Sequence, residues 1–463
     1  MTETHLRSTP PSARPLLDEL PAEIVVTDPD ITAGYARDQS RFTEHELPVA
    51  VLMPRSTEEV SRCLAVAHTA GIPVVARGAG SGLVGAANAS AGSVVLSLHR
   101  MDRIVEVDAA DRLAVVQPGV ITADLRAAAQ RAGLFYPPDP GSVAVSTVGG
   151  NVATNAGGMC CVKYGVTGDF VMGLEVVLAD GRVMRTGRRT VKGVAGYDLT
   201  HLFVGSEGTL GVITEITVRL VPEPLPAHTV VASFASLTEA GAVVSDVVRA
   251  GLTPSLLEIL DRTTVQAVDE MSGMGLGSQV AALLLVQSDD ADAEALLAQV
   301  EELCAAHGAV DVARSSDPDE AALLMEARRL ALPALERLGD WLLDDVAVPR
   351  SRIVDFIAAV EQVAAEVGLT IGVFGHAGDG NLHPTVIFDD ADPDSRAAAL
   401  RAFDAMTRRA LELGGTITGE HGVGRLKRAW LGVELDETAR EVHAALKQAL
   451  DPAHLLNPGS SLP

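Results

Sequence analysis

Residues 45–222 alternate stretches of helical periodicity with short runs rich in valine. Ser56-Thr57-Glu58-Glu59 has the capping-box pattern, and Val60, Leu64 and Ala67 then fall on one helical face. Gly71 predicts the end of this helix, and residues 72–76 have the pattern of a buried strand. Further strands are predicted at 93–98, 114–117, 173–178 and 211–220, with a helix at 122–132.

A proline-rich segment, Val221 to Pro226, is the clearest domain boundary. Beyond it, strands are predicted near 229–235, 255–260, 279–287, 341–348, 370–375 and 382–388, and helices near 237–250, 289–307, 318–338, 350–367 and 393–413. This order predicts an α+β domain with helices on one face of a largely antiparallel sheet.

The pattern divides the chain into four parts. Residues 1–44 form a leader and N-terminal segment, in which we expect Thr9–Pro15 to be disordered. The first domain covers 45–222 and the second covers 227–418. Residues 419–463, with a helix near 436–449, form a C-terminal segment that we expect to return to the first domain.

The composition, 47% hydrophobic and 21% charged over 463 residues, is that of a folded protein with more than one domain. A formal net charge of -25 argues against nucleic acid as a partner, because phosphate binding needs a basic face. The four cysteines have no disulfide, metal or iron–sulfur spacing, and no stretch predicts a signal peptide or a transmembrane segment. We expect a reduced, cytoplasmic protein.

Two histidine-containing segments carry the candidate chemistry of the second domain. His376 and His383 flank a Gly-Asp-Gly-Asn run, which predicts a turn that holds both at one end of adjacent strands. Glu420 and His421 follow on a separate glycine-flanked segment. Two imidazoles and a carboxylate suit a divalent metal such as Zn, Mn or Fe, and His421 is then free to act as a base. A His-x₆-His pair alone is a weak signal, and ordinary surface or core roles stay open.

The run Arg77 to Gly85 follows a predicted strand, and Gly80-x-Gly82-x-x-Gly85 matches the dinucleotide fingerprint. A Rossmann loop must open a helix, whereas residues 86–92 are turn-like and lead into another strand. This context argues against an NAD-dependent dehydrogenase. A loop whose backbone amides cradle a phosphate in another fold and a plain tight turn are equally open.

Three more glycine-punctuated runs follow in the first domain: Thr147–Gly158, Lys192–Leu199 and Gly205–Thr214. Their small residues let the backbone approach a flat ligand, and several side chains can supply hydrogen bonds. Such segments favour a large, extended cofactor. A non-haem iron oxygenase would share the metal ligands but would need none of these loops.

These runs resemble the FAD-binding domain of the vanillyl-alcohol oxidase/p-cresol methylhydroxylase superfamily. With Gly375–His383 and Gly419–Gly422, the chain from roughly residue 45 to 460 is similar to the FAD-linked D-2-hydroxyacid dehydrogenases. His383-Pro384 and Phe388-Asp389 are closest to the branch of the glycolate oxidase flavin subunit and D-lactate dehydrogenase. The resemblance implies an α+β fold, with a two-subdomain FAD-binding domain and an α+β cap domain built on an antiparallel sheet.

The resemblance also implies which residues contact FAD, and that FAD is bound noncovalently, since Ser81 stands in a loop where some members carry a flavin-linked histidine. The expected FAD contacts are Arg77, Gly78, Ala79, Gly80, Ser81, Gly82, Pro138, Ser142, Thr147, Gly149, Gly150, Asn151, Thr154, Asn155, Gly157, Glu207, Gly208, Gly211, Val212, Ile213 and Asn457.

In the cap, the resemblance makes His376, His383 and Glu420 metal ligands and His421 the catalytic base. It places Arg328 against the substrate carboxylate, although neighbouring Arg329 and a plain helix-surface role compete for that assignment. The implied reaction oxidises a small D-2-hydroxy acid, such as D-lactate or glycolate, to the 2-oxo acid by hydride transfer to flavin N5. Leu332 and Leu343 stand where 2-hydroxyglutarate enzymes carry threonine and lysine, which disfavours that dicarboxylate.

Other interpretations concern assembly. The chain could be a catalytically silent or accessory flavin subunit of a glycolate oxidase-type complex, although the intact histidine and glutamate set argues against silence. The acceptor of the electrons could be a quinone, a cytochrome, an electron-transfer flavoprotein or an iron–sulfur protein. A homodimer is a further possibility.

Overall fold

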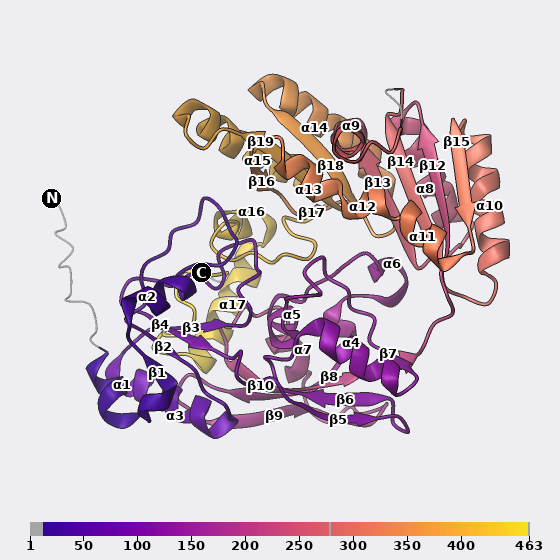
Figure 1. Cartoon of the computed structure of the whole chain (residues 1–463). Helices are drawn as coiled ribbons and strands as arrows, with labels where there is room; N and C mark the ends of the chain where they lie inside the picture. The colour runs from indigo at the N-terminus through magenta and orange to yellow at the C-terminus, as the bar shows by residue number, and fades with distance from the viewer. Residues whose placement is uncertain (1–12, 277–278, 462–463) are drawn as a thin grey trace.

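The computed structural model describes residues 13–276 and 279–461 (Figure 1). Most of the expected leader, Thr9–Pro15, therefore lies outside the described residues. Arg14 and Pro15 were expected to be disordered, but they begin helix α1 (Arg14–Glu19), whose Leu16 is buried. A proline in the first turn of a helix loses no hydrogen bond there, which explains how this segment starts a helix.

The first sheet of the N-terminal half has the order β1-β2-β4-β3. Strands β2, β4 and β3 run parallel, and β1 pairs antiparallel with β2. Helix α3 (Thr57–Ala70) packs on them, and the Ser56 hydroxyl accepts the Glu59 N–H as the capping box predicts. Gly71 ends this helix in the left-handed region. The strands are β1 (Val25–Val26), β2 (Ala50–Leu52), β3 (Val74–Arg77) and β4 (Val94–Ser97), and α2 spans Pro29–Thr32.

The second sheet is antiparallel, in the order β5-β6-β10-β8-β9. Its buried face packs against α4 and α5. Its strands are β5 (Ile104–Asp108), β6 (Leu113–Val116), β8 (Val171–Val177), β9 (Val183–Gly187) and β10 (Val212–Arg219). The helices are α4 (Thr122–Arg131), α5 (Val148–Thr154), α6 (Cys161–Tyr164) and α7 (Leu199–Phe203), and β7 (Leu134–Phe135) pairs with β11 (Val221–Pro222).

The cap, drawn above the first half in Figure 1, is one antiparallel sheet in the order β15-β12-β14-β13-β18-β19-β16, with β17 also on β19. Its strands are β12 (His228–Phe234), β13 (Leu256–Asp261), β14 (Ala282–Ser288), β15 (Asp311–Ser315), β16 (Asp340–Leu343), β17 (Val346–Ala347), β18 (Thr370–His376) and β19 (Asn381–Phe388).

Helices cover both faces of this sheet, so the expectation of helices on one face is wrong. One face packs against α8 (Leu237–Arg249), α10 (Ala293–Ala306), α14 (Ile353–Val367) and α15 (Pro393–Glu412). The other face packs against α9 (Arg262–Ser272), α12 (Glu326–Arg329) and α13 (Ala331–Glu336). Helix α11 (Pro318–Leu324) lies beside β12 and β15. Successive side chains of a strand alternate between faces, and β13 and β14 are apolar on both, so each face needs a cover.

Several boundaries in the cap differ from those predicted. Helix α9 and strand β15 were not foreseen, and the single helix expected at 318–338 is divided into α11, α12 and α13. The strand expected at 341–348 is interrupted by Asp344 and Asp345, whose buried carboxylates need partners outside the sheet ladder.

The C-terminal segment, yellow in Figure 1, contains α16 (Leu431–Glu434) and α17 (Glu437–Leu450) and lies against the N-terminal half. The backbone of Val74 bonds to Leu455 and Asn457 on its two sides. The buried Lys447 ammonium donates to the Thr209 and Leu456 carbonyls and pairs with the Asp451 carboxylate at 2.7 Å. Three acceptors around one buried cation fix this segment in place.

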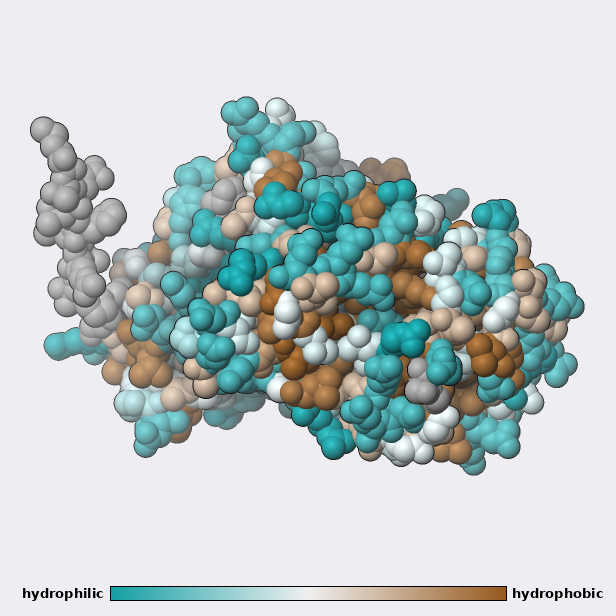
Figure 2. Space-filling view, turned by 90° about the horizontal axis from the view of Figure 1, so that it is seen from above, coloured by the Kyte–Doolittle hydropathy of each residue, from teal (hydrophilic) through white to brown (hydrophobic). Residues whose placement is uncertain are grey.

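Within the described residues, no helix is long and apolar enough to span a bilayer. The face seen from above in Figure 2 is mainly hydrophilic, with groups of hydrophobic residues broken up by polar ones.

Lys447→Met should destabilise the protein, because Asp451, 0% exposed, would lose its cation. Breaking a buried ion pair by removing one partner costs about 3–5 kcal/mol, so the urea midpoint followed by circular dichroism should fall clearly. Arg440→Met, at an exposed cation on the same helix, is the control and should leave the midpoint unchanged. Equal midpoints for the two variants would contradict the anchoring role.

Candidate active site

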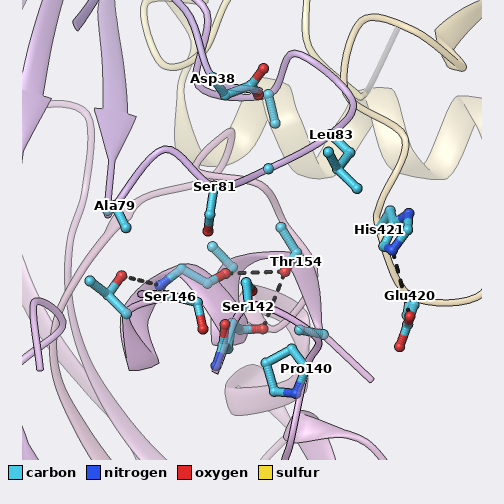
Figure 3. Close-up of a pocket in the computed structure, with 18 of the residues that line it drawn as sticks. Asp38, Ala79, Ser81, Leu83, Pro140, Ser142, Ser146, Thr154, Glu420 and His421 are labelled. Atoms are coloured by element: carbon cyan, nitrogen blue, oxygen red, sulfur yellow. Dashed lines mark hydrogen bonds and ion pairs between the residues drawn. The ribbon is translucent and has the colours of Figure 1, made fainter. Parts of the chain in front are cut away.

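A cavity of about 640 Å³ lies between the cap and the N-terminal half, a size typical of ligand sites. Figure 3 shows its polar floor around Ser142, Ser146 and Thr154, with Glu420 and His421 at one side. Most of the residues expected to contact FAD line it: Arg77, Gly78, Ala79, Gly80, Ser81, Gly82, Ser142, Thr147, Gly149, Gly150, Asn151, Thr154, Gly157, Glu207, Gly208, Gly211, Val212, Ile213 and Asn457.

Two positions in the cavity wall require glycine, because neighbouring atoms lie too close to the backbone to leave room for a Cβ. A Cβ at Gly78 would lie 2.4 Å from the Thr147 hydroxyl, and a Cβ at Gly149 would lie 2.4 Å from the Pro118 side chain. The Thr147 hydroxyl is needed where it is, because it accepts the Gly150 N–H and caps α5. Part of the glycine-rich run expected to be a loop is therefore the short helix α5.

Arg77 places a positive charge in the cavity wall. Its guanidinium donates to the Arg37 carbonyl at 2.9 Å and lies over the Tyr35 ring, and burial lowers the pKa of Arg77. Gly80, at φ 73°, passes so close that a Cβ would meet the guanidinium at 2.1 Å. A cation beside a glycine-rich backbone suits a diphosphate, the charged part of a dinucleotide.

Two residues expected at the cofactor do not line the cavity. Pro138 lies outside the lining while Pro140 lies within it. The Asn155 side chain is used inside the fold, where it accepts the Gly168 N–H at 2.8 Å. The run Lys192–Leu199 also lies away from the cavity, and Val194 and Tyr197 are 100% and 95% exposed. Glycine spacing alone did not distinguish a surface loop from a cofactor loop.

His376 and His383 come together because β18 and β19 form a hairpin, as the Gly-Asp-Gly-Asn run predicted. Asn381 pairs with His376 and His383 pairs with Phe374, so the two histidines are diagonal neighbours on one face. The turn needs Gly380, at φ 93°, since a Cβ would meet the Val348 carbonyl at 2.1 Å. The Nε2 atoms of His376 and His383 are 3.3 Å apart.

Glu420 completes a triangle with the two histidines. Its Oε1 is 3.5 Å from His376 Nε2 and 3.3 Å from His383 Nε2. A tetrahedral ion with ligand bonds of about 2.0–2.1 Å separates its ligand atoms by about 3.3–3.4 Å. The three side chains therefore have the chemistry and the spacing to hold a divalent metal, with further positions open to the cavity.

Two carboxylates behind the histidines were missed by the sequence reasoning. Glu258, on β13, accepts from His376 Nδ1 at 2.6 Å, and Asp345 lies 3.8 Å from His383 Nδ1. The Glu258 contact favours a His376 ring with Nδ1–H toward Glu258 and Nε2 toward the site, as in metal centres with a carboxylate behind the ligand, whereas His383 Nδ1 has no hydrogen-bond partner among the described residues. Burial lowers the pKa of His383 to about 3. Burial also acts to lower the pKa of His376, but the Glu258 and Glu420 carboxylates outweigh it and raise that pKa, so a metal would have to displace a proton from His376.

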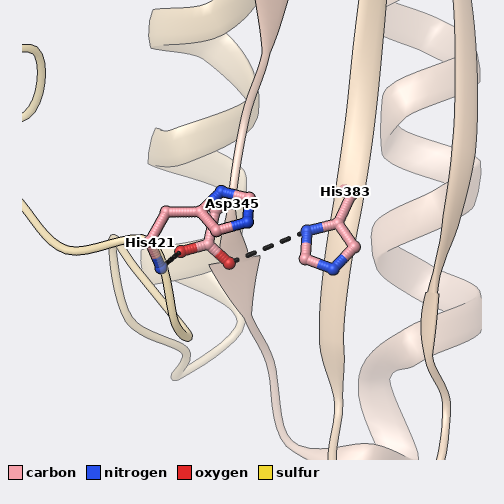
Figure 4. Close-up of side chains that lie close together, drawn as sticks. All are labelled: Asp345, His383 and His421. Atoms are coloured by element: carbon pink, nitrogen blue, oxygen red, sulfur yellow. Dashed lines mark hydrogen bonds and ion pairs between the residues drawn. The ribbon is translucent and has the colours of Figure 1, made fainter. Parts of the chain in front are cut away.

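Asp345, His383 and His421 also lie close together (Figure 4), but both carboxylate oxygens of Asp345 already accept hydrogen bonds. Its Oδ2 accepts the backbone N–H groups of Gly419, Glu420 and His421 at 2.8–3.0 Å and the Thr418 hydroxyl. Its Oδ1 accepts from Asn381 Nδ2 at 2.8 Å. A carboxylate with five donors is a structural clamp on the 418–421 segment, and the set around Glu420 is the better metal site.

His421 lines the cavity beside the proposed ligands. Its ring stacks on His383 with centroids 5.2 Å apart, and its Nε2 lies 3.5 Å from Glu420. Burial lowers the pKa of His421, but the Asp345 and Glu420 carboxylates outweigh it and raise that pKa above the ordinary 6.5. The ring can thus exchange a proton with a ligand in the cavity.

Arg328 reaches the same cavity from α12, on the sheet face that carries Glu258 and both histidines. It bonds Glu258 through Nε, and its guanidinium lies over the Phe374 ring, 4.9 Å from the centroid. That bond uses one of the five N–H donors of a guanidinium, so others can reach an anion in the cavity. The adjacent Arg329 also lines the cavity, but it is half-exposed and pairs with Glu326.

An apolar section of the wall lies on the cap side, beside Arg328. It consists of Met159, Leu332, Pro333, Leu343 and Phe374. Of these, only the two leucines were singled out from the sequence. Such a wall accepts a ligand with an apolar group and penalises an unpaired charge.

Glu207, expected to line the cofactor, also tethers the segment that carries His421. Its buried carboxylate accepts the N–H groups of Val423 and Gly424 at 2.7 and 2.8 Å. Asn457 joins the same region, donating to the Ala86 and Glu207 carbonyls and accepting the Ala76 N–H. The cavity wall on this side is therefore held by the side chains of Glu207 and Asn457, which join segments far apart in sequence.

Two family models match the chain. The model described as "FAD binding domain" matches residues 48–187, and the model described as "FAD linked oxidases, C-terminal domain" matches residues 223–461.

Named relatives and a solved structure agree with these matches. The chain is 45% identical to the glycolate oxidase subunit GlcD of Bacillus subtilis, over 89% of this chain and 88% of that one. It is 33% identical to the D-lactate dehydrogenase of Anaerostipes hadrus, over 99% of each chain. Its fold is similar to that of substrate-bound p-cresol methylhydroxylase, with a TM-score of 0.80, 18% identity, and coverage of 97% of this chain and 96% of that one.

His383→Ala should abolish stoichiometric metal binding while leaving the flavin spectrum intact, because it removes one ligand and touches no part of the first domain's glycine loops. Elemental analysis after dialysis should find about one divalent metal per wild-type chain and much less in the variant. His45→Ala, at an exposed histidine, is the control. Equal metal content in all three proteins would remove His383 from the site.

Proposed function

The chain belongs to the FAD-linked oxidases, and from this premise we propose that it oxidises a small D-2-hydroxy acid to the 2-oxo acid. Its family makes it an oxidoreductase with FAD as cofactor and a fold of the vanillyl-alcohol oxidase/p-cresol methylhydroxylase type. Relatives named glycolate oxidase subunit and D-lactate dehydrogenase support the substrate class. D-Lactate and glycolate-like acids are the substrates we propose.

One observation carries the proposal: Arg328, His376, His383, Glu420 and His421 line one cavity together with the glycine-rich loops of the FAD-binding domain. A 2-hydroxy acid presents a carboxylate and a hydroxyl on adjacent carbons. Arg328 suits the carboxylate, and the set His376, His383 and Glu420 suits a metal at the hydroxyl.

The residues of the chain would divide the reaction among them. Arg328 binds one carboxylate oxygen and fixes the orientation of C2. His421 accepts the hydroxyl proton on its neutral imidazole. A divalent metal at the triangle, when bound, would lower the hydroxyl pKa as a Lewis acid. FAD, when bound, supplies N5 as the acceptor of the C2 hydride. The buried Glu258 keeps His376 in position, and the buried Asp345 holds the backbone of Gly419, Glu420 and His421.

The apolar wall supports a substrate with a short or apolar side chain. Leu332 and Leu343 would face the group on C2, and a second carboxylate against them would be desolvated without a partner. Arg329 does not change this conclusion, since it is half-exposed and already paired with Glu326. D-2-Hydroxyglutarate is therefore the less favoured substrate.

A place in a larger assembly is the second candidate. One relative is named as a subunit, which favours an assembly with other chains that take the electrons onward. The acceptor could be a quinone, a cytochrome, an electron-transfer flavoprotein or an iron–sulfur protein. A catalytically accessory role is disfavoured by the spacing of His376, His383, Glu420 and His421 around the cavity.

The first test is an anaerobic absorbance titration of the purified protein with D-lactate, L-lactate, glycolate and D-2-hydroxyglutarate. We expect D-lactate or glycolate to bleach the flavin band, and L-lactate and D-2-hydroxyglutarate to do so at least about tenfold less efficiently, because one leaves C2 misoriented and the other buries a charge. A yellow protein that none of the acids bleaches would overturn the proposed substrate class.

His421→Ala should keep FAD and metal but lose about 10²- to 10⁴-fold in turnover, the usual contribution of a general base. In the wild type, kcat/KM should fall as the pH falls through the pKa of His421, because the protonated ring cannot accept the hydroxyl proton. The residual rate of the variant should lack this acidic limb. A pH–rate profile with an unchanged limb in the variant would assign the limb to another group.

A further inference from the structure

We propose that Glu258 is a positioning residue that sets the distance between the proposed metal site and the substrate-binding arginine. This inference rests on the proposed function. Glu258 lies in the middle of strand β13 and its side chain is 0% exposed. No motif in the sequence indicated Glu258, and its role is inferred from its contacts.

The two oxygens of the Glu258 carboxylate have separate partners. Oε1 accepts from His376 Nδ1 at 2.6 Å, and Oε2 accepts from Arg328 Nε. The strand register explains the first contact, since Ile259 of β13 pairs with Gly375 of β18 and brings Glu258 beside His376. The second contact comes from α12, on the same face of the sheet.

The first contact fixes a tautomer. With Nδ1–H donated to Glu258, a neutral His376 ring, the form that binds a metal, has its lone pair on Nε2, which faces Glu420 and His383. His383 has no comparable support: its Nδ1 has no hydrogen-bond partner among the described residues, and the nearest Asp345 oxygen is 3.8 Å away. Of the two histidines, only His376 is therefore held at Nδ1 by a hydrogen-bonded carboxylate, and that carboxylate is Glu258.

The second contact fixes the plane of the Arg328 guanidinium. Held at Nε and lying over Phe374, the guanidinium has little freedom to turn. The reacting hydroxyl and the carboxylate of a 2-hydroxy acid are on adjacent carbons, so their two binding groups must keep a fixed separation. Because the Glu258 carboxylate bonds both His376 and Arg328, it fixes the separation between these two binding groups directly.

Glu258→Gln, Glu258→Asp and the control Asp261→Asn test this role. Gln can accept at one oxygen only, and Asp is one methylene too short to reach both partners. Asp261 is a buried carboxylate on the same strand that caps α9, away from the cavity. It therefore reports the cost of losing any buried charge from β13.

Metal affinity, read by chelator competition on the purified flavoprotein, is the measurement independent of turnover. We expect about a 10- to 100-fold weaker affinity in both Glu258 variants, with FAD content and thermal midpoint close to those of Asp261→Asn. Metal affinity within twofold of the wild type in either folded variant would overturn the proposal. If Glu258→Gln does not fold, Glu258→Asp, which keeps the charge, decides alone.

A double variant tests the link to Arg328. Arg328→Ala should raise KM without changing metal affinity, since Arg328 is not a ligand. With metal at a saturating concentration, so that a weaker metal affinity does not itself raise KM, Glu258→Gln should still raise KM. The two changes together should then raise KM no more than Arg328→Ala alone, because both act through one guanidinium. KM increases that multiply would show that Glu258 does not act through Arg328 and would overturn the proposed coupling.

Failure of this inference and failure of the proposed function give different results. If wild-type protein binds metal and is reduced by a 2-hydroxy acid, yet the Glu258 variants match it, only the role of Glu258 is lost. If the wild type neither binds metal nor is reduced by any of the acids, the proposed function itself fails.

Discussion

A buried carboxylate needs hydrogen-bond donors, and at the centre of this molecule the segment 418–424 supplies them to two carboxylates at once. Asp345 of the cap accepts three consecutive N–H groups from Gly419 to His421, and Glu207 of the FAD-binding domain accepts the next two free ones, from Val423 and Gly424. Hydrogen bonds to charged acceptors are stronger than neutral ones and costly to lose when buried. The position of Glu420 and His421 relative to both domains follows from this double attachment.

Positive charge is local in a chain with a net charge of -25. Arg77 lies in the part of the cavity wall formed by the glycine-rich loops, and Arg328 lies on the side of the cap. Buried carboxylates lie beside His376 and His383. An acidic surface does not prevent an acid from binding, because a buried guanidinium acts over a short distance in a medium of low dielectric. A bound divalent cation would add to the same effect.

The sequence predicted those parts of the site that are close together along the chain. The turn between His376 and His383 revealed a hairpin, and flanking glycines marked Glu420 and His421. The family resemblance supplied Arg328. Glu258 and Asp345 could not be predicted, because each is a single acidic residue whose partners come from strands and helices far away in sequence. Glycine content also gave two wrong predictions of cofactor loops, since Lys192–Leu199 lies at the surface and Thr147–Gly158 contains a helix. Glycine permits a conformation without specifying one.

The attachment of the C-terminal segment has a consequence for how the protein is made. A ribosome synthesises the FAD-binding domain first and the sheet of the cap next, and both can fold as units while the chain is still growing. Glu420, His421 and Asn457 are translated after every other element of the cavity described above. The nascent chain therefore lacks Glu420 and His421, the proposed third metal ligand and base, until the whole sheet of the cap has been translated. The proposed site can be completed only after both domains have been synthesised, which delays any redox chemistry there until that point.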